Sequence, residues 1–399
     1  MDVPAEDGEA LARWAASGLM HLTGTPRTPL GPPAGFVEKV TELGRRFVDG
    51  DALTLLAERA AAAGLARQGA VSCGGSCRLL RARDGWIALN LARPEDIDAM
   101  AAWLERDLPD GVPLPDALAA TVQHRSVAEL TGRGRLLGIP VSALGEERGA
   151  AATVRTHLGT AEPVHDLAGL VIVDLTALWA GPLCGDLLAS RGAEVVKVES
   201  TARPDGARRG PAAFFDLMNW RKRSVALDFG HRDGVAALRR LLRGADVVLE
   251  SSRPRALAQL GIEATELVAA SSGGPRVWVC ISGYGRGGLG ADRVAFGDDA
   301  AVGGGLVVYA GTRPLFCADA VADPVAGLAA AGACLDALEG GGRWLLDVSM
   351  AGAAAQLTGT TLPVPASLRP MPPAARRAPR PAPALGADTE SVLARLPRP

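Results

Sequence analysis

The segment LVIVDLTALWAGPLCGDLLASRGAEVVKVES, residues 170–200, decides the fold. It begins with the β-branched run LVIVDLT (170–176) and ends with EVVKVES (194–200), and both are typical of strands that are buried in a parallel sheet. Between them lies PLCGDLLASRG, which is typical of a helix. A strand, a helix and a second strand in this order predict a parallel β-α-β unit.

The same alternation continues along the chain. Runs at 224–229, 246–251 and 276–282 predict three more strands, and the helical pattern RDGVAALRRLLRG separates the first two. A helix over about 324–338 and the strand RWLLDVSM follow. We therefore expect an α/β fold with an open, mostly parallel, Rossmann-like sheet.

A smaller α+β domain is expected before this sheet, over residues 1–158. This part combines helical patterns with the strand pair CRLLRARDGWIALNL, whose turn is marked by Asp84 and Gly85. The α/β domain is expected over 166–355. The remainder, 356–399, is expected to be a Pro-rich strap followed by a C-terminal helix, ADTESVLARL, capped by its Asp and Thr.

Composition argues against several classes of protein. The 42 basic and 44 acidic residues give a formal net charge of −2, whereas a nucleic-acid-binding protein normally carries a basic excess. Six cysteines in 399 residues do not make a disulfide framework, so we expect a cytoplasmic protein. The N-terminus lacks an apolar signal core, and the longest uncharged stretch, 348–368, is too polar for a membrane span.

Two motifs that would imply other cofactors are weak. Cys73 and Cys77 are close in sequence, but no second Cys or His pair accompanies them, so no metal site is expected. GYGRGG (283–288) matches the dinucleotide fingerprint G-x-G-x-x-G after a strand, yet the residues that follow it do not form a helix. We therefore expect neither zinc nor NAD.

Carboxylates beside small residues are the chemical signal that remains. Asp298 and Asp299 lie in FGDDAAVGGG, and Asp319 and Asp323 lie in CADAVADPVAG. Asp323 precedes a proline at the start of a predicted helix, where an acid is usually a cap. It can equally be a reactive group, because small neighbours allow a bulky substrate to approach. The residues alone leave both interpretations open.

From Leu167 onward, the order of the segments resembles the class III CoA-transferase family, which includes formyl-CoA and carnitine CoA-transferases and α-methylacyl-CoA racemase. The matching segments are LAGLVIVDLTALWAGPLCGDLLASRGAEVVKVES, MNWRKRSVALDF, DVVLESSRPRALAQLGI, RVWVCISGYGRGG, ADPVAGLAAAGACLDAL and GGGRWLLDVSM. SGLMHLTGTP, RARDGWIALNL and RSVAELTGRGRLLGIPVSAL resemble the family's small-domain part, which normally follows the sheet. The chain thus resembles a member with a rearranged domain order.

The resemblance implies an acyl-CoA:carboxylate CoA-transferase that acts through an aspartyl mixed anhydride. In the family an aspartate attacks the acyl-CoA thioester and forms a mixed anhydride. An acceptor carboxylate then replaces the donor acid in that anhydride. The matching residue is Asp323, and Asp319 is the alternative. The implied substrates are an acyl-CoA and a carboxylic acid, with coenzyme A as the carried group. The resemblance also implies a homodimer, since the family forms dimers of two interlocked chains.

The resemblance also suggests which residues contact coenzyme A: Trp179, Ala180, Leu227, Asp228, Ser251, Ser252, Arg221 and Lys222. A helix that begins just after a strand offers free N–H groups to a phosphate. Arg221 and Lys222 lie in the densest basic cluster of the chain, which is equally consistent with a solvated surface. The family usually has Asn followed by an aromatic residue where this chain has Ser251 and Ser252.

Two other functions stay open. The rearranged order and the Ser251-Ser252 pair favour a non-catalytic CoA-binding paralogue or subunit. An acyl-CoA racemase or isomerase is less favoured, because AFGDDAA contains no histidine where the racemase branch carries a His-Asp pair. The loop SCGGSC, with Gly74 and Gly75, is either a cover over the reactive aspartate or an ordinary tight loop.

Overall fold

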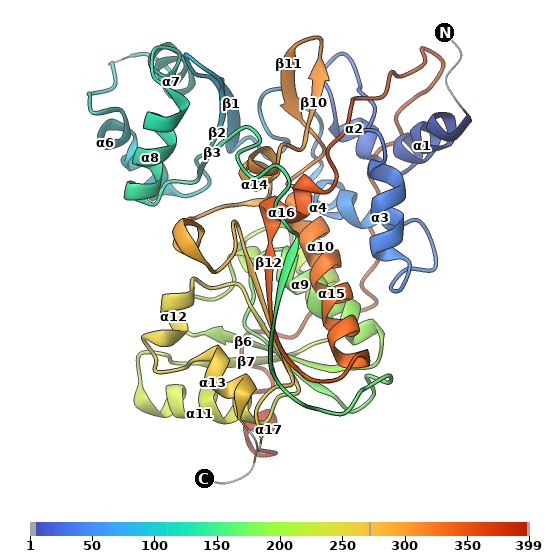
Figure 1. The fold of residues 1–399 in the computed structure, drawn as a ribbon, viewed down its shortest axis with the longest axis vertical. Helices are drawn as coiled ribbons and strands as arrows, with labels where there is room; N and C mark the ends of the chain where they lie inside the picture. Colours follow the sequence, from blue (N-terminus) through green and yellow to red (C-terminus); the bar gives the residue numbers. More distant parts are fainter. Residues whose placement is uncertain (1–4, 110, 271–272, 397–399) are drawn as a thin grey trace.

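The computed structural model describes residues 5–109, 111–270 and 273–396, and a seven-stranded sheet forms its centre (Figure 1). The strand order is β4-β12-β9-β8-β5-β6-β7, and all neighbours are parallel except β4, which runs antiparallel to β12. The expected open, mostly parallel sheet is confirmed. The strands are β4 (Thr153–Gly159), β5 (Val171–Asp174), β6 (Glu194–Ser200), β7 (Arg223–Leu227), β8 (Val247–Glu250), β9 (Val277–Ser282) and β12 (Arg343–Ser349).

The direction in which strands are added reverses at β5. From β5 the chain adds β6 and then β7 on one side, and it then crosses over to add β8, β9 and β12 on the other side. In open α/β sheets, ligands bind beyond the carboxyl ends of the strands at such a switch point. Topology alone therefore directs a ligand to the space beyond the ends of β5 and β8.

Helices cover both faces of the sheet (Figure 1). Side chains alternate along each strand, so Ile172 lies in one core and Val173 in the other. The first layer contains α9 (Ala180–Ser190), α10 (Ala212–Asn219), α15 (Ala322–Glu339) and α16 (Met350–Ala355). The second contains α11 (Arg232–Arg243), α12 (Pro254–Ala258), α13 (Ala264–Ala269) and α17 (Thr389–Leu393).

The described part of residues 1–158, which we expected to form one small domain, lies in three places. The first helices share the core of α9 and α15: α1 (Ala5–Ala16), α2 (Leu19–Leu22), α3 (Phe36–Gly44), η1 (Ala52–Ala57) and α4 (Glu58–Ala63). These helices pack there because the buried residues of α15 occur all round that helix. The side of α15 that faces away from the sheet must therefore be covered by other helices. Strand β4 joins the main sheet instead.

Only the middle of this segment forms a separate lobe. Its antiparallel sheet contains β1 (Cys77–Arg81), β2 (Trp86–Asn90) and β3 (Val141–Ala143), which includes the strand pair expected around Asp84 and Gly85. Its helices are α5 (Pro94–Asp98), α6 (Met100–Leu104), α7 (Leu114–Val122) and α8 (Val127–Leu137). Trp103 lies in the centre of the lobe's own core.

Several short elements complete the described fold. These are η2 (Gly206–Arg209), η3 (Gly288–Gly290), α14 (Gly297–Gly304) and the hairpin of β10 (Val307–Ala310) and β11 (Arg313–Phe316). Helix α14 contacts β2 and β3 of the lobe as well as α15 and α16, so it joins the two parts. No helix in the described part of the chain combines the length and the hydropathy needed to cross a membrane.

The strap crosses the first helical layer and ends on the edge strand β7. Asp388 was expected to cap the last helix, but its carboxylate accepts a hydrogen bond from the Ser224 N–H (2.9 Å), and Thr389 accepts one from the Ala226 N–H (3.1 Å). Edge strands carry unpaired backbone groups, and these contacts satisfy two of them. Arg376 holds the middle of the strap to Glu58 (2.7 Å) and Asp186 (2.9 Å).

We expect Arg376→Ala to destabilise the fold by about 3 kcal/mol, because it leaves the fully buried carboxylate of Glu58 without its cation. Urea unfolding measures this change. Arg377→Ala is the matched control: it removes the neighbouring exposed arginine and should cost less than about 0.5 kcal/mol. Equal losses in the two variants would show that the strap is not anchored by Arg376.

Candidate active site

Three adjoining cavities lie at the carboxyl ends of the sheet strands. The crevice, of about 750 Å³, is lined by residues that follow β5, β6 and β8, where the topology directs a ligand. The inner cavity, of about 240 Å³, adjoins the crevice and is lined in part by residues of the segment 291–296. The lobe cavity, of about 390 Å³, is bounded partly by the small lobe. Leu178 lines all three cavities, so it stands at their junction.

Asp323 lies in the first turn of α15 and is half-buried, facing both the inner cavity and the lobe cavity. Two glycines allow this placement. A Cβ on Gly297 would lie 2.2 Å from the Asp323 Oδ2, so only glycine lets α14 come so close to the carboxylate. A Cβ on Gly327 would lie 2.6 Å from the Ala180 carbonyl oxygen, so this glycine lets α15 pack on the start of α9.

The backbone around the site is strained. Among the described residues, four that are not glycine have positive φ, and three of them border the site: Leu178 (68°), Ala318 (57°) and Ala320 (43°). Such conformations cost on the order of 1–3 kcal/mol each and gather at functional sites. Asp205 holds Leu178 by accepting its N–H (3.0 Å), and Lys197, which is buried, pairs with the same carboxylate (2.9 Å).

Three carboxylates gather around the guanidinium of Arg59. Asp319 is fully buried and accepts two hydrogen bonds from Arg59 (2.8 and 2.5 Å), and Asp298 accepts the Ala320 N–H (2.9 Å). Burial raises the pKa of Asp298 above its ordinary value and raises the pKa of Asp323 to about 7, although Arg59 opposes both shifts. Asp298 and Asp323 both line the lobe cavity, but only Asp323 of the three also lines the inner cavity, and Asp319 lines neither. This position favours Asp323 over Asp319 as a reactive group.

Four of the expected coenzyme A contacts do line these cavities. Ala180 borders the inner cavity, and Ser251 and Ser252 border both it and the crevice. The Ser251 hydroxyl accepts the Ala177 N–H (3.3 Å), which leaves its own proton available to a ligand. Trp179 borders the lobe cavity and packs edge-on against Phe214, with ring centroids 5.3 Å apart.

The other four expected contacts do not line these cavities. Leu227 is buried at the end of β7, and Asp228 is exposed in the turn beyond it, accepting the Gly230 N–H (2.8 Å). Arg221 lies over the Trp220 ring and pairs with Asp186. Lys222 is neither on a solvated surface nor free for a phosphate, because its buried ammonium pairs with the buried carboxylate of Asp174 (2.8 Å).

Three arginines that were not predicted from the sequence border the cavities. Arg203 lines the crevice, Arg253 lines the inner cavity, and Arg209 lines both the crevice and the lobe cavity. Within the described residues, none of these three side chains has a hydrogen-bond or ion-pair partner. Arg208 and Arg209 form an adjacent pair just beyond strand β6, and that position was the available signal.

The SCGGSC loop borders the lobe cavity. Ser76 is one of its lining residues, and Gly74 is exposed beside the Arg59 guanidinium, where a Cβ would lie 3.3 Å from the Nη2. Cys73 and Cys77 are both buried and free. The loop therefore lies next to the cavity that Asp323 faces, which is compatible with the covering role suggested by the sequence.

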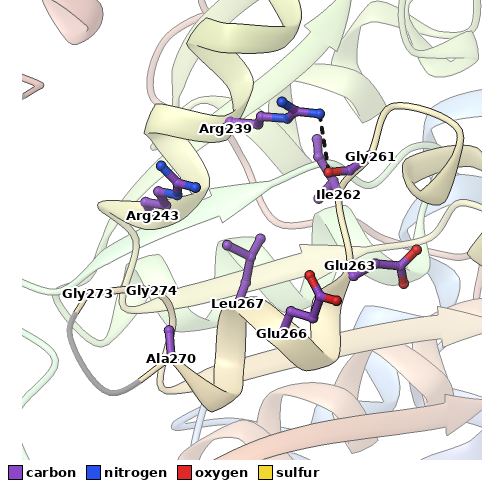
Figure 2. Close-up of a pocket in the computed structure, with 10 residues that line it drawn as sticks. All are labelled: Arg239, Arg243, Gly261, Ile262, Glu263, Glu266, Leu267, Ala270, Gly273 and Gly274. Carbon is purple, nitrogen blue, oxygen red and sulfur yellow. Dashed lines mark hydrogen bonds between the residues drawn. The ribbon is translucent and has the colours of Figure 1, made fainter. Parts of the chain in front are cut away.

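A separate groove of about 480 Å³ lies between α11 and α13, in the second helical layer (Figure 2). Arg239 crosses its upper rim to donate to the Gly261 carbonyl oxygen (3.3 Å), and Glu263 and Glu266 line its other side. None of the residues expected to carry chemistry lines this groove. In the described part of the chain, no group of three or more His, Cys, Asp or Glu residues is arranged to hold a metal ion.

Comparison with known proteins points to one family. The sequence model for CoA-transferase family III matches residues 167–387, more than half of the chain. A succinyl-CoA–D-citramalate CoA-transferase of Chloroflexus aurantiacus is 32% identical over 161 residues, 39% of this chain and 40% of that protein. An (R)-2-hydroxy-4-methylpentanoate CoA-transferase of Clostridioides difficile is 33% identical over 187 residues, 43% of this chain and 46% of that protein.

The chain therefore aligns with less than half the length of these curated relatives. Among solved structures, a CAIB/BAIF family protein from Brucella suis has 28% sequence identity and a TM-score of 0.43. That match covers 49% of this chain and 56% of the other.

The raised pKa of Asp323 makes stability depend on pH. This carboxyl holds its proton up to about pH 7 in the folded chain but only to about pH 4 when unfolded, so it costs stability as the pH rises through that window. Asp323→Asn removes the cost, and we expect its stabilising effect to be larger at pH 8 than at pH 5 by on the order of 2 kcal/mol. Urea unfolding at both pH values measures it. An equal effect of Asp323→Asn at both pH values would contradict the expectation.

Lys222→Met should destabilise the fold by about 3 kcal/mol, because it leaves the buried Asp174 carboxylate without its cation. Arg221→Ala, at the exposed neighbour, should cost less than about 1 kcal/mol. Thermal unfolding compares the two variants, and titration with coenzyme A is run beside it. A Lys222→Met protein of unchanged stability that binds coenzyme A more weakly would restore the phosphate-binding role.

Proposed function

Since the chain belongs to CoA-transferase family III, as the order of its motifs predicts, we propose that it transfers coenzyme A from an acyl-CoA to a carboxylic acid, with Asp323 as the nucleophile. The observation that carries this proposal is the position of Asp323. Its carboxylate is accessible at the meeting of two cavities, while the neighbouring Asp319 is bound to Arg59.

The proposed reaction begins when an Asp323 oxygen attacks the thioester carbonyl carbon. The C–S bond breaks, the CoA thiolate leaves with the electron pair, and a mixed anhydride remains on Asp323. The acceptor carboxylate then attacks the aspartyl carbonyl carbon and releases the donor acid, which leaves the acceptor's acyl group on Asp323. Attack by the CoA thiolate on that group forms the new thioester and restores the Asp323 carboxylate.

The electrostatics suit this role. A carboxylate with a pKa of about 7 is a stronger base, and thus a better nucleophile, than an ordinary carboxylate, yet it is largely ionised just above neutral pH. Arg59 binds the adjacent Asp319, so that the cluster contains a cation beside the reacting group. The same cation favours the anionic form of Asp323 and opposes the effect of its burial.

In the proposed complex, coenzyme A occupies the crevice. Arg203 borders the crevice and Arg253 the adjoining inner cavity, and both offer unpaired guanidinium groups to phosphates. Helix α9 begins at Ala180 beside the inner cavity, so its first N–H groups are also available to an anion. The pantetheine arm would pass Ala177 and Leu178, which line both spaces, to bring the thioester to Asp323.

The names of the relatives support carboxylic acids as acceptors, since those proteins are described as acting on citramalate and on a hydroxy acid. The proposal extends to a homodimer, which the family resemblance implies, and to a cytoplasmic location, which the cysteine content favours. A second candidate is a non-catalytic CoA-binding subunit. It is favoured by the alignment, which covers less than half of each relative. Against it stands the N-terminal segment, which supplies Arg59 and Ser76 to the lobe cavity beside Asp323.

Asp323→Ala should lower CoA transfer by at least about 10³-fold while coenzyme A binding is kept, because the variant lacks the nucleophile but retains the crevice. The assay uses a panel of acyl-CoA donors and carboxylate acceptors, with hydroxylamine to trap the acylated enzyme. Asp116→Asn, which changes an exposed carboxylate away from the cavities, is the control and should transfer normally.

Each other result has a defined meaning. A wild-type protein that binds coenzyme A but forms no adduct with any donor would favour the non-catalytic subunit. A wild-type protein that neither binds coenzyme A nor forms an adduct would overturn the proposed function. Transfer that survives in Asp323→Ala but is lost in Asp319→Ala would move the nucleophile to the alternative aspartate.

A further inference from the structure

The lobe cavity carries opposite charges on its wall. Asp298 and Asp323 contribute carboxylates, and three arginines contribute cations: Arg59, Arg93 and Arg209. Two of these are already neutralised. Arg59 is bound to Asp319, and Arg93 donates to the buried carboxylate of Asp96 (2.9 Å). Arg209 differs, because no acid in the described part of the chain pairs with it.

The position of Arg209 directs its charge toward the cavities. It is the last residue of η2, and its guanidinium lies against Gly206, where a Cβ would be 3.7 Å from the Nη2. Leu178, the residue at the junction of the cavities, lies against the same glycine at 3.4 Å. The free guanidinium is therefore placed where the lobe cavity meets the crevice.

Much of the remaining wall is apolar. Trp179, Phe214 and Phe296 line the lobe cavity together with Ala63, Ala92 and Ala207. Such a wall suits methylene groups and offers little to a polar chain. The cavity, at about 390 Å³, is large enough for a short acyl chain. Its occupant would meet a nucleophile, an apolar wall and a free cation.

We propose that Arg209 selects acyl groups that carry a second carboxylate, so that the preferred substrate is a short dicarboxylic acid. This inference rests on the proposed function and adds the substrate class. The carbonyl to be attacked lies at Asp323, the methylene chain lies along the aromatic wall, and the remote carboxylate accepts hydrogen bonds from the Arg209 guanidinium. Arginine suits this role because its planar fork can bind a carboxylate through two parallel hydrogen bonds.

A phosphate of coenzyme A is the competing partner for Arg209, because this residue also borders the crevice. The chain offers a matched control for that possibility. Arg203 is likewise exposed and unpaired within the described residues, and it lines the crevice without lining the lobe cavity. An effect on coenzyme A should therefore appear in variants of both arginines, whereas an effect on the remote carboxylate should appear at Arg209 alone.

The test compares succinyl-CoA with butyryl-CoA, which have acyl chains of equal length and differ in the remote carboxylate. The ratio of their kcat/KM values is measured for the wild-type protein, Arg209→Gln and Arg203→Gln. We expect the wild type to prefer succinyl-CoA and Arg209→Gln to reduce that ratio by about 10- to 100-fold. Arg203→Gln should lower both kcat/KM values and keep their ratio. Arg209→Lys retains the charge without the fork and should restore part of the preference.

Isothermal titration with free succinate and free butyrate gives a second readout that needs no turnover. Tighter binding of succinate that is lost in Arg209→Gln supports the inference even where neither thioester reacts, and in that case only the transferase proposal fails. Transfer from both donors without a preference overturns the inference and leaves the transferase proposal standing. A ratio that Arg209→Gln leaves unchanged while both values fall assigns Arg209 to coenzyme A, which also overturns the inference.

Discussion

The ion pair between Arg59 and Asp319 holds the site together. Asp319 is fully buried, so its carboxylate would be very costly without the two hydrogen bonds that Arg59 donates. Arg59 comes from α4 in the N-terminal segment, whereas Asp319 lies between the two left-handed residues Ala318 and Ala320, just before α15. One interaction therefore joins two distant parts of the chain and fixes the strained loop that positions Asp323.

The same cluster couples stability to reactivity. Packing Asp298, Asp319 and Asp323 around one guanidinium leaves more negative charge than Arg59 can balance, and burial raises the pKa of Asp323 to about 7. A carboxylate that is easily ionised would be more stable in the fold but a poorer nucleophile. The buried carboxylates are thus unfavourable for stability at the place where the proposed chemistry needs them, as is common at functional sites.

The sheet and the place of Asp323 at the start of a helix were predictable from sequence, but the cations at the cavities were not. Parallel strands buried on both faces leave continuous β-branched runs such as 170–176, and Asp323 stands in a recognisable motif at a helix start. Arg221 and Lys222 form the densest basic cluster in the sequence, yet Lys222 is used to neutralise Asp174, 48 residues earlier. Density of charge along a chain does not report burial. Arg209, which has no acidic partner among the described residues, borders two cavities because it follows β6.

The unusual order of the segments has a physical basis in α15. This helix is buried all round, so any arrangement of the chain must cover the side that faces away from the sheet. Here α3 and η1 of the N-terminal segment provide that cover, and the neighbouring α4 brings Arg59 to the site. Cover for the helix and a cation for the carboxylates thus come from one segment. The position of that segment along the chain matters less than the contacts it makes, which is why a rearranged order is compatible with a complete site.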